Sequence, residues 1–197
     1  GGDFVGSTVV GDHDLRFIIG DVSGHGPDAA ALGATLRSTW KALALAGVST
    51  SETVSIMHRM LLAERTQPSI FATIVAGRVD FRGQTISLVN AGHLPPLLIA
   101  RQVISLDTKP VLPLGVGAGD ALTETEFPLP KRWSLFCYTD GLIDIRLTPG
   151  SSQRYGEERL RERLTPWTKR RPGGPELDSL MKEIESASGG RFADDVA

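Results

Sequence analysis

Hydrophobic and polar positions in the first third of the chain follow two different periods. Two apolar runs flank the polar stretch "GDHD" within residues 4–20, and this pattern predicts a β-hairpin. Across residues 27–47 and 49–64, apolar side chains recur every three to four positions, which predicts two amphipathic helices. Pro27 suits the first turn of the first helix, and a Ser-x-x-Glu capping box opens the second.

The rest of the chain consists of short apolar runs separated by turn residues. We expect strands in "FATIVAGRVD", "QTISLVN", "PPLLIA", "RQVISL", "ALTETEF" and "WSLFCYT", the last a central strand because it is almost uniformly apolar. Residues 155–164 and 175–188 favour helices, "DDVA" begins another strand, and the Gly/Pro-rich "KPVLPLGVGAGD" indicates a surface loop. Strands and helices come in groups, so the predicted class is α+β with antiparallel sheet.

Length and composition narrow the class of protein. The 197 residues are 41% hydrophobic and 22% charged, which predicts one domain over residues 1–197. A net charge of −2 does not attract nucleic acid or an anionic membrane, and no apolar run reaches the ~20 residues of a membrane helix. The single cysteine, Cys137, predicts a buried thiol in a cytoplasmic protein. The chain begins at Gly1 and stops as a strand begins, so we expect it to be part of a longer protein.

Carboxylates gather at the open end of the predicted hairpin. Pairing about Asp12 places residues whose numbers add up to 24 opposite each other, so Asp3 faces Asp21. Opposed Cβ atoms lie ~5 Å apart, and two carboxylates at that distance repel unless a cation lies between them. A divalent metal ion is the candidate.

Further aspartates occupy comparable places. Asp140 follows the apolar run "SLFCYT", and Asp194 and Asp195 precede the end of the chain, where another strand is expected. A strand that ends in Asp and an antiparallel neighbour that begins with Asp bring those side chains to one edge of a sheet. Such an all-oxygen site favours Mg²⁺ or Mn²⁺ over zinc. Asp beside Gly is also common in ordinary turns, so the prediction depends on the combination of aspartates at several strand ends and not on any one of them.

Seven motifs along the chain carry a family resemblance. In order, they are "GGDF", "GDVSGHG", "FATIVAGRVD", "NAGHLPPLL", "LPLGV", "YTDGLID" and "FADDVA". Together they resemble the SpoIIE/RsbU-type serine phosphatases, a bacterial branch of the metal-dependent, type 2C-like (PPM) protein phosphatases. The resemblance implies a four-layer αββα sandwich of two antiparallel sheets flanked by helices, with a site for two Mn²⁺ or Mg²⁺ ions at one end.

The resemblance also implies roles for individual residues. Asp3 and Asp21 match carboxylates that bridge or flank the two metal ions, and the backbone carbonyl of Val22 matches a further ligand. Asp140 and Asp194 match ligands of the other ion. Catalysis then consists of the attack of a metal-activated water on a phosphoserine, without a covalent phosphoenzyme.

Several positions differ from the family pattern or have no assigned role. Gly6 stands where the family usually has a second Asp, as in GGDxxD, which puts the strength of metal binding in question. Asp144 stands where Glu is more common. His25 is a candidate general acid, but its spacing from Asp21 differs from that in distant relatives, so a role in the loop is the preferred interpretation. His93, in "NAGH", is expected in a turn or behind the metal ligands.

The predicted function is that of a protein serine/threonine phosphatase. The resemblance implies a phosphorylated STAS-type anti-anti-sigma protein as substrate, in a bacterial stress response, and an upstream sensory domain in the same chain. The resemblance leaves open whether the protein forms a homodimer. An inactive phosphatase fold that binds a signalling partner stays open as an alternative. A diguanylate cyclase is excluded, because "GGDF" lacks the further acidic residue that this signature needs between Asp and Phe, and "DVSGHG" has no counterpart there.

Overall fold

The computed structural model describes residues 2–117, 122–146, 154–187 and 196–197. The chain divides into two compact units. Unit 1 consists of Gly1–Pro95 and Asp107–Leu129, and unit 2 of Pro96–Leu106 and Pro130–Ala197. A single domain over the whole chain stays a prediction.

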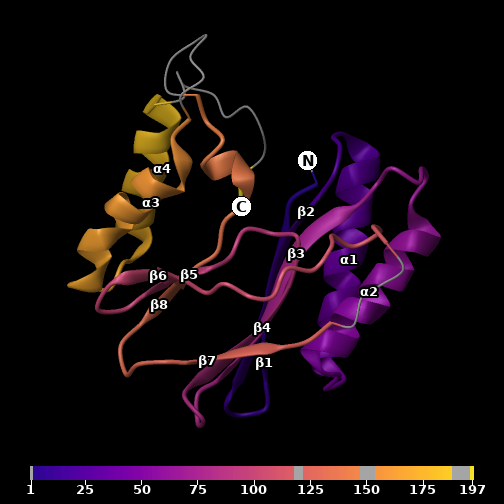
Figure 1. Cartoon of the computed structure of the whole chain (residues 1–197), viewed down its shortest axis with the longest axis horizontal. Helices are drawn as coiled ribbons and strands as arrows, with labels where there is room; N and C mark the ends of the chain where they lie inside the picture. The colour runs from indigo at the N-terminus through magenta and orange to yellow at the C-terminus, as the bar shows by residue number, and fades with distance from the viewer. Residues whose placement is uncertain (1, 118–121, 147–153, 188–195) are drawn as a thin grey trace. The chain divides into compact units, whose positions relative to one another are not determined.

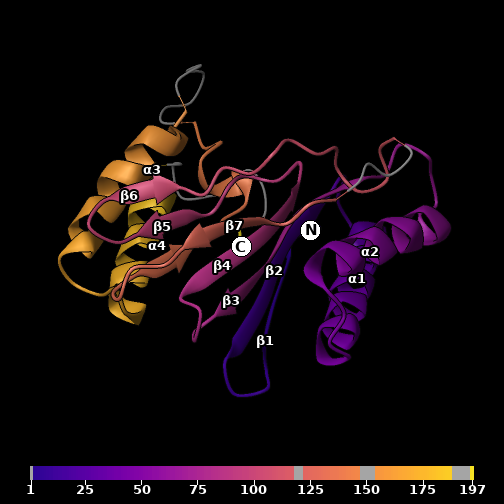
Figure 2. The same ribbon diagram turned by 60° about the horizontal axis from the view of Figure 1, so that its bottom comes forward.

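Unit 1 contains a five-stranded antiparallel sheet with the strand order β1-β2-β3-β4-β7. Its strands are β1 (Phe4–Val10), β2 (Asp14–Val22), β3 (Ala72–Asp80), β4 (Thr85–Ala91) and β7 (Thr125–Pro128). Two helices, α1 (Pro27–Leu45) and α2 (Thr50–Glu64), lie side by side against the same face of β1–β4 (Figures 1 and 2). The predicted hairpin and both predicted helices are confirmed.

Local signals explain where the two helices begin and end. The N–H of Glu52 donates to Oγ of Ser49, so the predicted cap opens α2. At the end of α1, the chain turns at Gly47 with φ of 78°, and the N–H of Val48 donates to the carbonyl oxygen of Leu43. This is a left-handed glycine ending of the helix.

The core of unit 1 lies between the helices and one face of the sheet. Its fully buried members include Leu36, Met57 and Leu61 from the helices and Ile18, Val22, Ala72, Ile74 and Ala76 from the strands. Burial of each large side chain contributes about 1.5–3 kcal/mol. Because successive strand residues point to opposite faces, Asp21 and Thr73 point to the face away from α1 and α2.

The segment "KPVLPLGVGAGD" is not simply a surface loop. Leu114 is 1% exposed, and its N–H and carbonyl oxygen pair with Ala72 at 2.8 and 3.0 Å. Arg65, at the end of α2, donates from Nη1 to three carbonyl oxygens, one of them that of Gly115. The surface-loop prediction is wrong at Leu114, because backbone pairing with a distant strand holds this apolar side chain in the core.

Unit 2 contains a three-stranded antiparallel sheet with the strand order β6-β5-β8. Its elements are β5 (Leu97–Ile99), β6 (Val103–Ser105), β8 (Ser134–Phe136), the 3-10 helices η1 (Asp140–Leu142) and η2 (Thr165–Thr168), and the helices α3 (Gly156–Leu164) and α4 (Gly174–Ala187). An ion pair between Arg163 and Glu183 joins α3 to α4, which lie side by side in Figure 2. The ring of Trp167 in η2 packs edge-on against Phe136 of β8, with centroids 6.0 Å apart.

Strand β8 differs from the sequence expectation. It is three residues long and pairs only with β5 within the described part of the chain, so it is an edge strand there rather than a central one. Its apolar side chains line a cavity of about 600 Å³ together with Trp167 and Leu177. Cys137 also lines this cavity: the residue as a whole is partly exposed, but its thiol is buried enough to raise its pKa, in agreement with the predicted buried thiol. Among the described residues, the apolar pattern of β8 therefore corresponds to the lining of this cavity.

None of the helices among the described residues is both long enough and apolar enough to cross a bilayer. Of the last predicted strand, "DDVA", only residues 196–197 belong to the described part of the chain.

Candidate metal centre

The β1–β2 hairpin has the register that the sequence predicts. The residue numbers of every partner pair add up to 24. The ladder continues beyond the first strand residue, because the N–H of Val22 donates to the carbonyl oxygen of Gly2 at 3.2 Å. Asp3 and Asp21 therefore lie opposite each other at the open end of the hairpin, where the N-terminus lies beside β2 (Figure 1).

Gly2 leaves room beside two oxygen atoms of β2. A Cβ atom at Gly2 would lie 2.2 Å from the carbonyl oxygen of Val22 and 2.9 Å from Oδ1 of Asp21. Both distances are shorter than a van der Waals contact, so only glycine fits here without a shift of the backbone. The Val22 carbonyl and the Asp21 carboxylate thus border one small space. Oxygen donors of this kind, with the opposed carboxylate of Asp3, fit a hard divalent cation such as Mg²⁺ or Mn²⁺.

The loop from β2 to α1 turns away directly after these donors. The N–H of Ser23 donates to the carbonyl oxygen of Phe71 at 2.9 Å, and the N–H of Phe71 donates back to Oγ of Ser23 at 3.0 Å. This reciprocal pair fixes the end of β2. His25 follows as an exposed residue between two glycines with positive φ.

Asp140 belongs to unit 2, where it is the exposed first residue of η1. Thr139, directly before it, is fully buried and pairs with the end of the chain. The N–H of Ala197 donates to Oγ1 of Thr139 at 3.1 Å, and the N–H of Thr139 donates to the carbonyl oxygen of Ala197 at 3.3 Å. The end of "FADDVA" therefore runs beside the residue that precedes Asp140. Asp194 lies outside the described residues.

The predicted ligands are divided between the two units. Across residues 2–117, 122–146, 154–187 and 196–197, no group of three or more His, Cys, Asp or Glu side chains could hold a metal ion. The structure brings together Asp3 and Asp21 in unit 1. The convergence of this pair with Asp140 and Asp194 stays a prediction.

The aspartate that the family usually has at position 6 would not join this pair. Gly6 lies on the face of β1 opposite to Asp3, because residues an odd number apart point to opposite faces. A Cβ atom at Gly6 would lie 2.7 Å from Cζ3 of Trp40 on α1. A side chain at this position would therefore point at the helix layer, and its absence leaves the Asp3–Asp21 pair intact.

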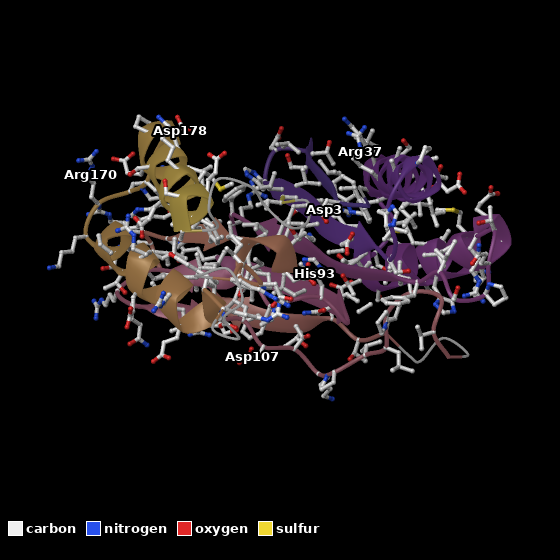
Figure 3. The ribbon with its side chains drawn as sticks, turned by 90° about the horizontal axis from the view of Figure 1, so that it is seen from above. Asp3, Arg37, His93, Asp107, Arg170 and Asp178 are labelled. Carbon is white, nitrogen blue, oxygen red and sulfur yellow. The ribbon has the colours of Figure 1, made fainter. Side chains whose placement is uncertain are left out.

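Strands β3 and β4 add two further polar side chains at this end of the sheet. Thr73 pairs with Asp21 across β2 and β3. Oγ1 of Thr73 lies 2.9 Å from Nδ1 of His93, which is buried directly after β4 and is labelled in Figure 3. The sequence singled out His93 but not Thr73. The β2–β3 pairing spans both helices of unit 1, so no local signal marks Thr73 as a neighbour of Asp21.

The family assignment follows from comparison with known proteins. A family model described as stage II sporulation protein E (SpoIIE) matches residues 11–197. The chain belongs to the SpoIIE family. The resemblance stated from the seven sequence motifs is confirmed.

Relatives and solved structures agree with this membership of the SpoIIE family. The phosphoserine phosphatase RsbP of Bacillus subtilis is 26% identical over 149 residues, which cover 73% of this chain and 36% of RsbP. A Mycobacterium tuberculosis structure of RsbU and RsbW domains has 26% identity and a TM-score of 0.81, over 99% of this chain and 53% of that one. The SiaA-PP2C domain of Pseudomonas aeruginosa has 18% identity and a TM-score of 0.84, over 100% of this chain and 78% of that one.

These likenesses confirm the α+β class and the PP2C-type fold of this SpoIIE-family chain. The chain spans about a third of the length of the curated relatives that it matches.

Proposed function

We propose that this chain is the catalytic domain of a metal-dependent protein phosphatase that hydrolyses phosphoserine. The observation that carries the proposal is the opposition of Asp3 and Asp21 beside the space that Gly2 leaves, in a chain of the SpoIIE family. RsbP is a phosphoserine phosphatase, which supports serine as the dephosphorylated residue.

The proposed site holds two Mn²⁺ or Mg²⁺ ions. Asp3, Asp21 and the carbonyl of Val22 bind from unit 1, and Asp140 and Asp194 complete the ligand set. When bound, two such ions supply an activated water near neutral pH and neutralise charge on the phosphoryl group. The contribution of this chain is to hold opposed carboxylates in a fixed strand register, so that their mutual repulsion is relieved by cation binding.

The proposed substrate is a phosphoserine on a STAS-type regulatory protein, and the proposed context is a partner-switching pathway in a bacterial stress response. The M. tuberculosis relative, in which RsbU and RsbW domains occur together, supports this context. We also propose an upstream sensory domain in the same protein, since the curated relatives are about three times as long as the matched segment.

Hydrolysis of p-nitrophenyl phosphate and of a phosphoserine peptide, titrated with Mn²⁺, tests the proposal. Asp21→Asn removes one charged ligand, and Asp12→Asn, in the exposed turn at the other end of the same hairpin, is the matched control. We expect activity that requires Mn²⁺, falls by at least about 100-fold in D21N and is unchanged in D12N. Wild-type activity that survives chelation, together with an active D21N, would contradict the proposed mechanism.

The alternative is an inactive fold that binds a signalling partner. The reason to consider it is Gly6, which replaces a carboxylate of the family pattern. The position of Gly6 against Trp40, on the face away from Asp3, supports the catalytic proposal instead. A wild-type protein without hydrolytic activity under any divalent metal would favour the alternative.

A further inference from the structure

Four polar side chains come from one end of the sheet in unit 1. β1 and β3 begin at this end and β2 and β4 finish there, so the antiparallel order brings Asp3, Asp21, Thr73 and His93 to it. Neighbouring strands lie about 4.8 Å apart. Asp3 and His93, the first and last members of this row, are both labelled in Figure 3.

The backbone of His93 is held by the side chain of Asn90. Oδ1 of Asn90 accepts from the N–H of His93 at 2.8 Å, and Nδ2 of Asn90 donates to the carbonyl oxygen of His93 at 2.9 Å. This clasp closes a turn in which Gly92 has φ of 72°. His93 is 9% exposed, so its ring is held at a defined place beside Thr73.

The hydroxyl of Thr73 has two polar neighbours, the imidazole of His93 and the carboxylate of the opposed Asp21. The Cβ atoms of opposed residues are ~5 Å apart, so a rotation about χ1 of Thr73 would bring its hydroxyl within reach of the Asp21 carboxylate. In the structure the hydroxyl oxygen lies 2.9 Å from Nδ1 of His93 instead, and Nδ1 accepts from the hydroxyl in the tautomer of His93 that carries its proton on Nε2. A hydroxyl that donated to Asp21 would compete with a metal ion for a carboxylate lone pair. The β-branched Thr73 has few χ1 states, so one hydrogen bond suffices to select between them.

We propose that His93 is a positioning residue for metal binding: as the tautomer protonated on Nε2, it accepts from the hydroxyl of Thr73 at Nδ1 and keeps that donor away from the carboxylate of Asp21. This inference rests on the proposed function, in which Asp21 binds a metal ion. It assigns a purpose to the "NAGH" motif, whose Asn90 and His93 form the clasp and the hydrogen bond to Thr73.

Mn²⁺ affinity without substrate, measured from the electron paramagnetic resonance signal of unbound Mn²⁺, tests the inference. His93→Leu removes the hydrogen bond at similar volume, and we expect Mn²⁺ to bind about 10-fold more weakly. Thr73→Val removes the hydroxyl at nearly the same shape, and we expect near wild-type affinity. The double variant H93L/T73V should recover the affinity of T73V, because the competing donor is then absent.

Two variants separate this role from a general effect on packing. His58→Leu replaces another buried histidine of unit 1, whose Nδ1 accepts from the N–H of Gly115, and should lower the unfolding temperature but not the Mn²⁺ affinity. Asn90→Ala opens the clasp and retains the imidazole. It should weaken Mn²⁺ binding, again with recovery on Thr73→Val, and it serves in place of H93L if that variant does not fold.

Two results would overturn the inference while the proposed function stands: an H93L variant with wild-type Mn²⁺ affinity, or a double variant that binds as weakly as H93L. If the wild type does not bind Mn²⁺, or if D21N binds it as tightly as the wild type, the proposed function fails and this inference fails with it.

Discussion

Gly6 on β1 packs directly against the indole of Trp40 on α1, where an added Cβ atom would lie 2.7 Å from Cζ3. Trp40 is 2% exposed and belongs to the core of unit 1. The aspartate that the family usually has at position 6 would therefore compete with this tryptophan for the same space. The space that a longer side chain at position 6 would enter is filled by the indole.

Restoring the family residue should destabilise the protein. Gly6→Asp forces a carboxylate against a buried ring, so we expect the free energy of unfolding to fall by about 3 kcal/mol or more. Ser7→Asp, at the adjacent exposed position, should change it by less than about 0.5 kcal/mol. Urea unfolding followed by tryptophan fluorescence measures both. A G6D variant as stable as the wild type would show that α1 does not pack on β1 in this way.

A methyl group at Gly2 should act on metal binding. Gly2→Ala places Cβ within 2.2 Å of the Val22 carbonyl oxygen, which must then move away from its place beside Asp21. We expect Mn²⁺ affinity, measured by isothermal titration calorimetry, to fall by about 10-fold or more. Gly174→Ala, at the start of α4, adds the same methyl group where no atom lies within 4 Å and should leave the affinity unchanged. Equal affinities of the two variants would argue against a Val22 ligand.

Arg65 should be worth more to stability than an ordinary surface arginine. Its Nη1 donates at 2.8 to 3.1 Å to the carbonyl oxygens of Pro68, Ile70 and Gly115. Arg65→Met keeps most of the aliphatic stem and removes the donors, so we expect a loss of about 1.5–3 kcal/mol in urea unfolding. Arg59→Met, at an exposed position of α2, is the control and should have little effect.

Cys137 should be unreactive near neutral pH. Burial raises the pKa of its thiol to about 12, so the thiolate forms only at strongly alkaline pH. At pH 8, about one thiol in ten thousand is ionised. Reaction with Ellman's reagent should be slow in the folded protein and fast in denaturant, and Cys137→Ser should keep Mn²⁺-dependent hydrolysis. Rapid labelling of the folded protein, or loss of activity in C137S, would point to a cysteine-dependent mechanism.

Local interactions account for the parts that the sequence predicts correctly. Ser49 caps α2 through a residue three positions away, and Gly47 ends α1 within its own last turn. The opposition of Asp3 and Asp21 is likewise local, because a tight turn sets the register of the hairpin. The seven motifs also identified the family, because their order and spacing can be read from the sequence without knowledge of the contacts.

Long-range pairing decides the rest. Leu114 joins the core through Ala72, and Thr73 meets both Asp21 and His93, although each contact joins segments that are far apart in the chain. Strand β8 lines a cavity together with Trp167, and no period in its own sequence reveals this contact.

By itself, then, the sequence determined the family, the hairpin that opposes two carboxylates, and the helices that follow. Only the tertiary structure decided which side chains lie beside those carboxylates. It also decided that the indole of Trp40 packs against Gly6. The physical reason is that a turn or a cap depends on residues a few positions apart, whereas the neighbours of a strand depend on how the whole sheet buries its apolar face.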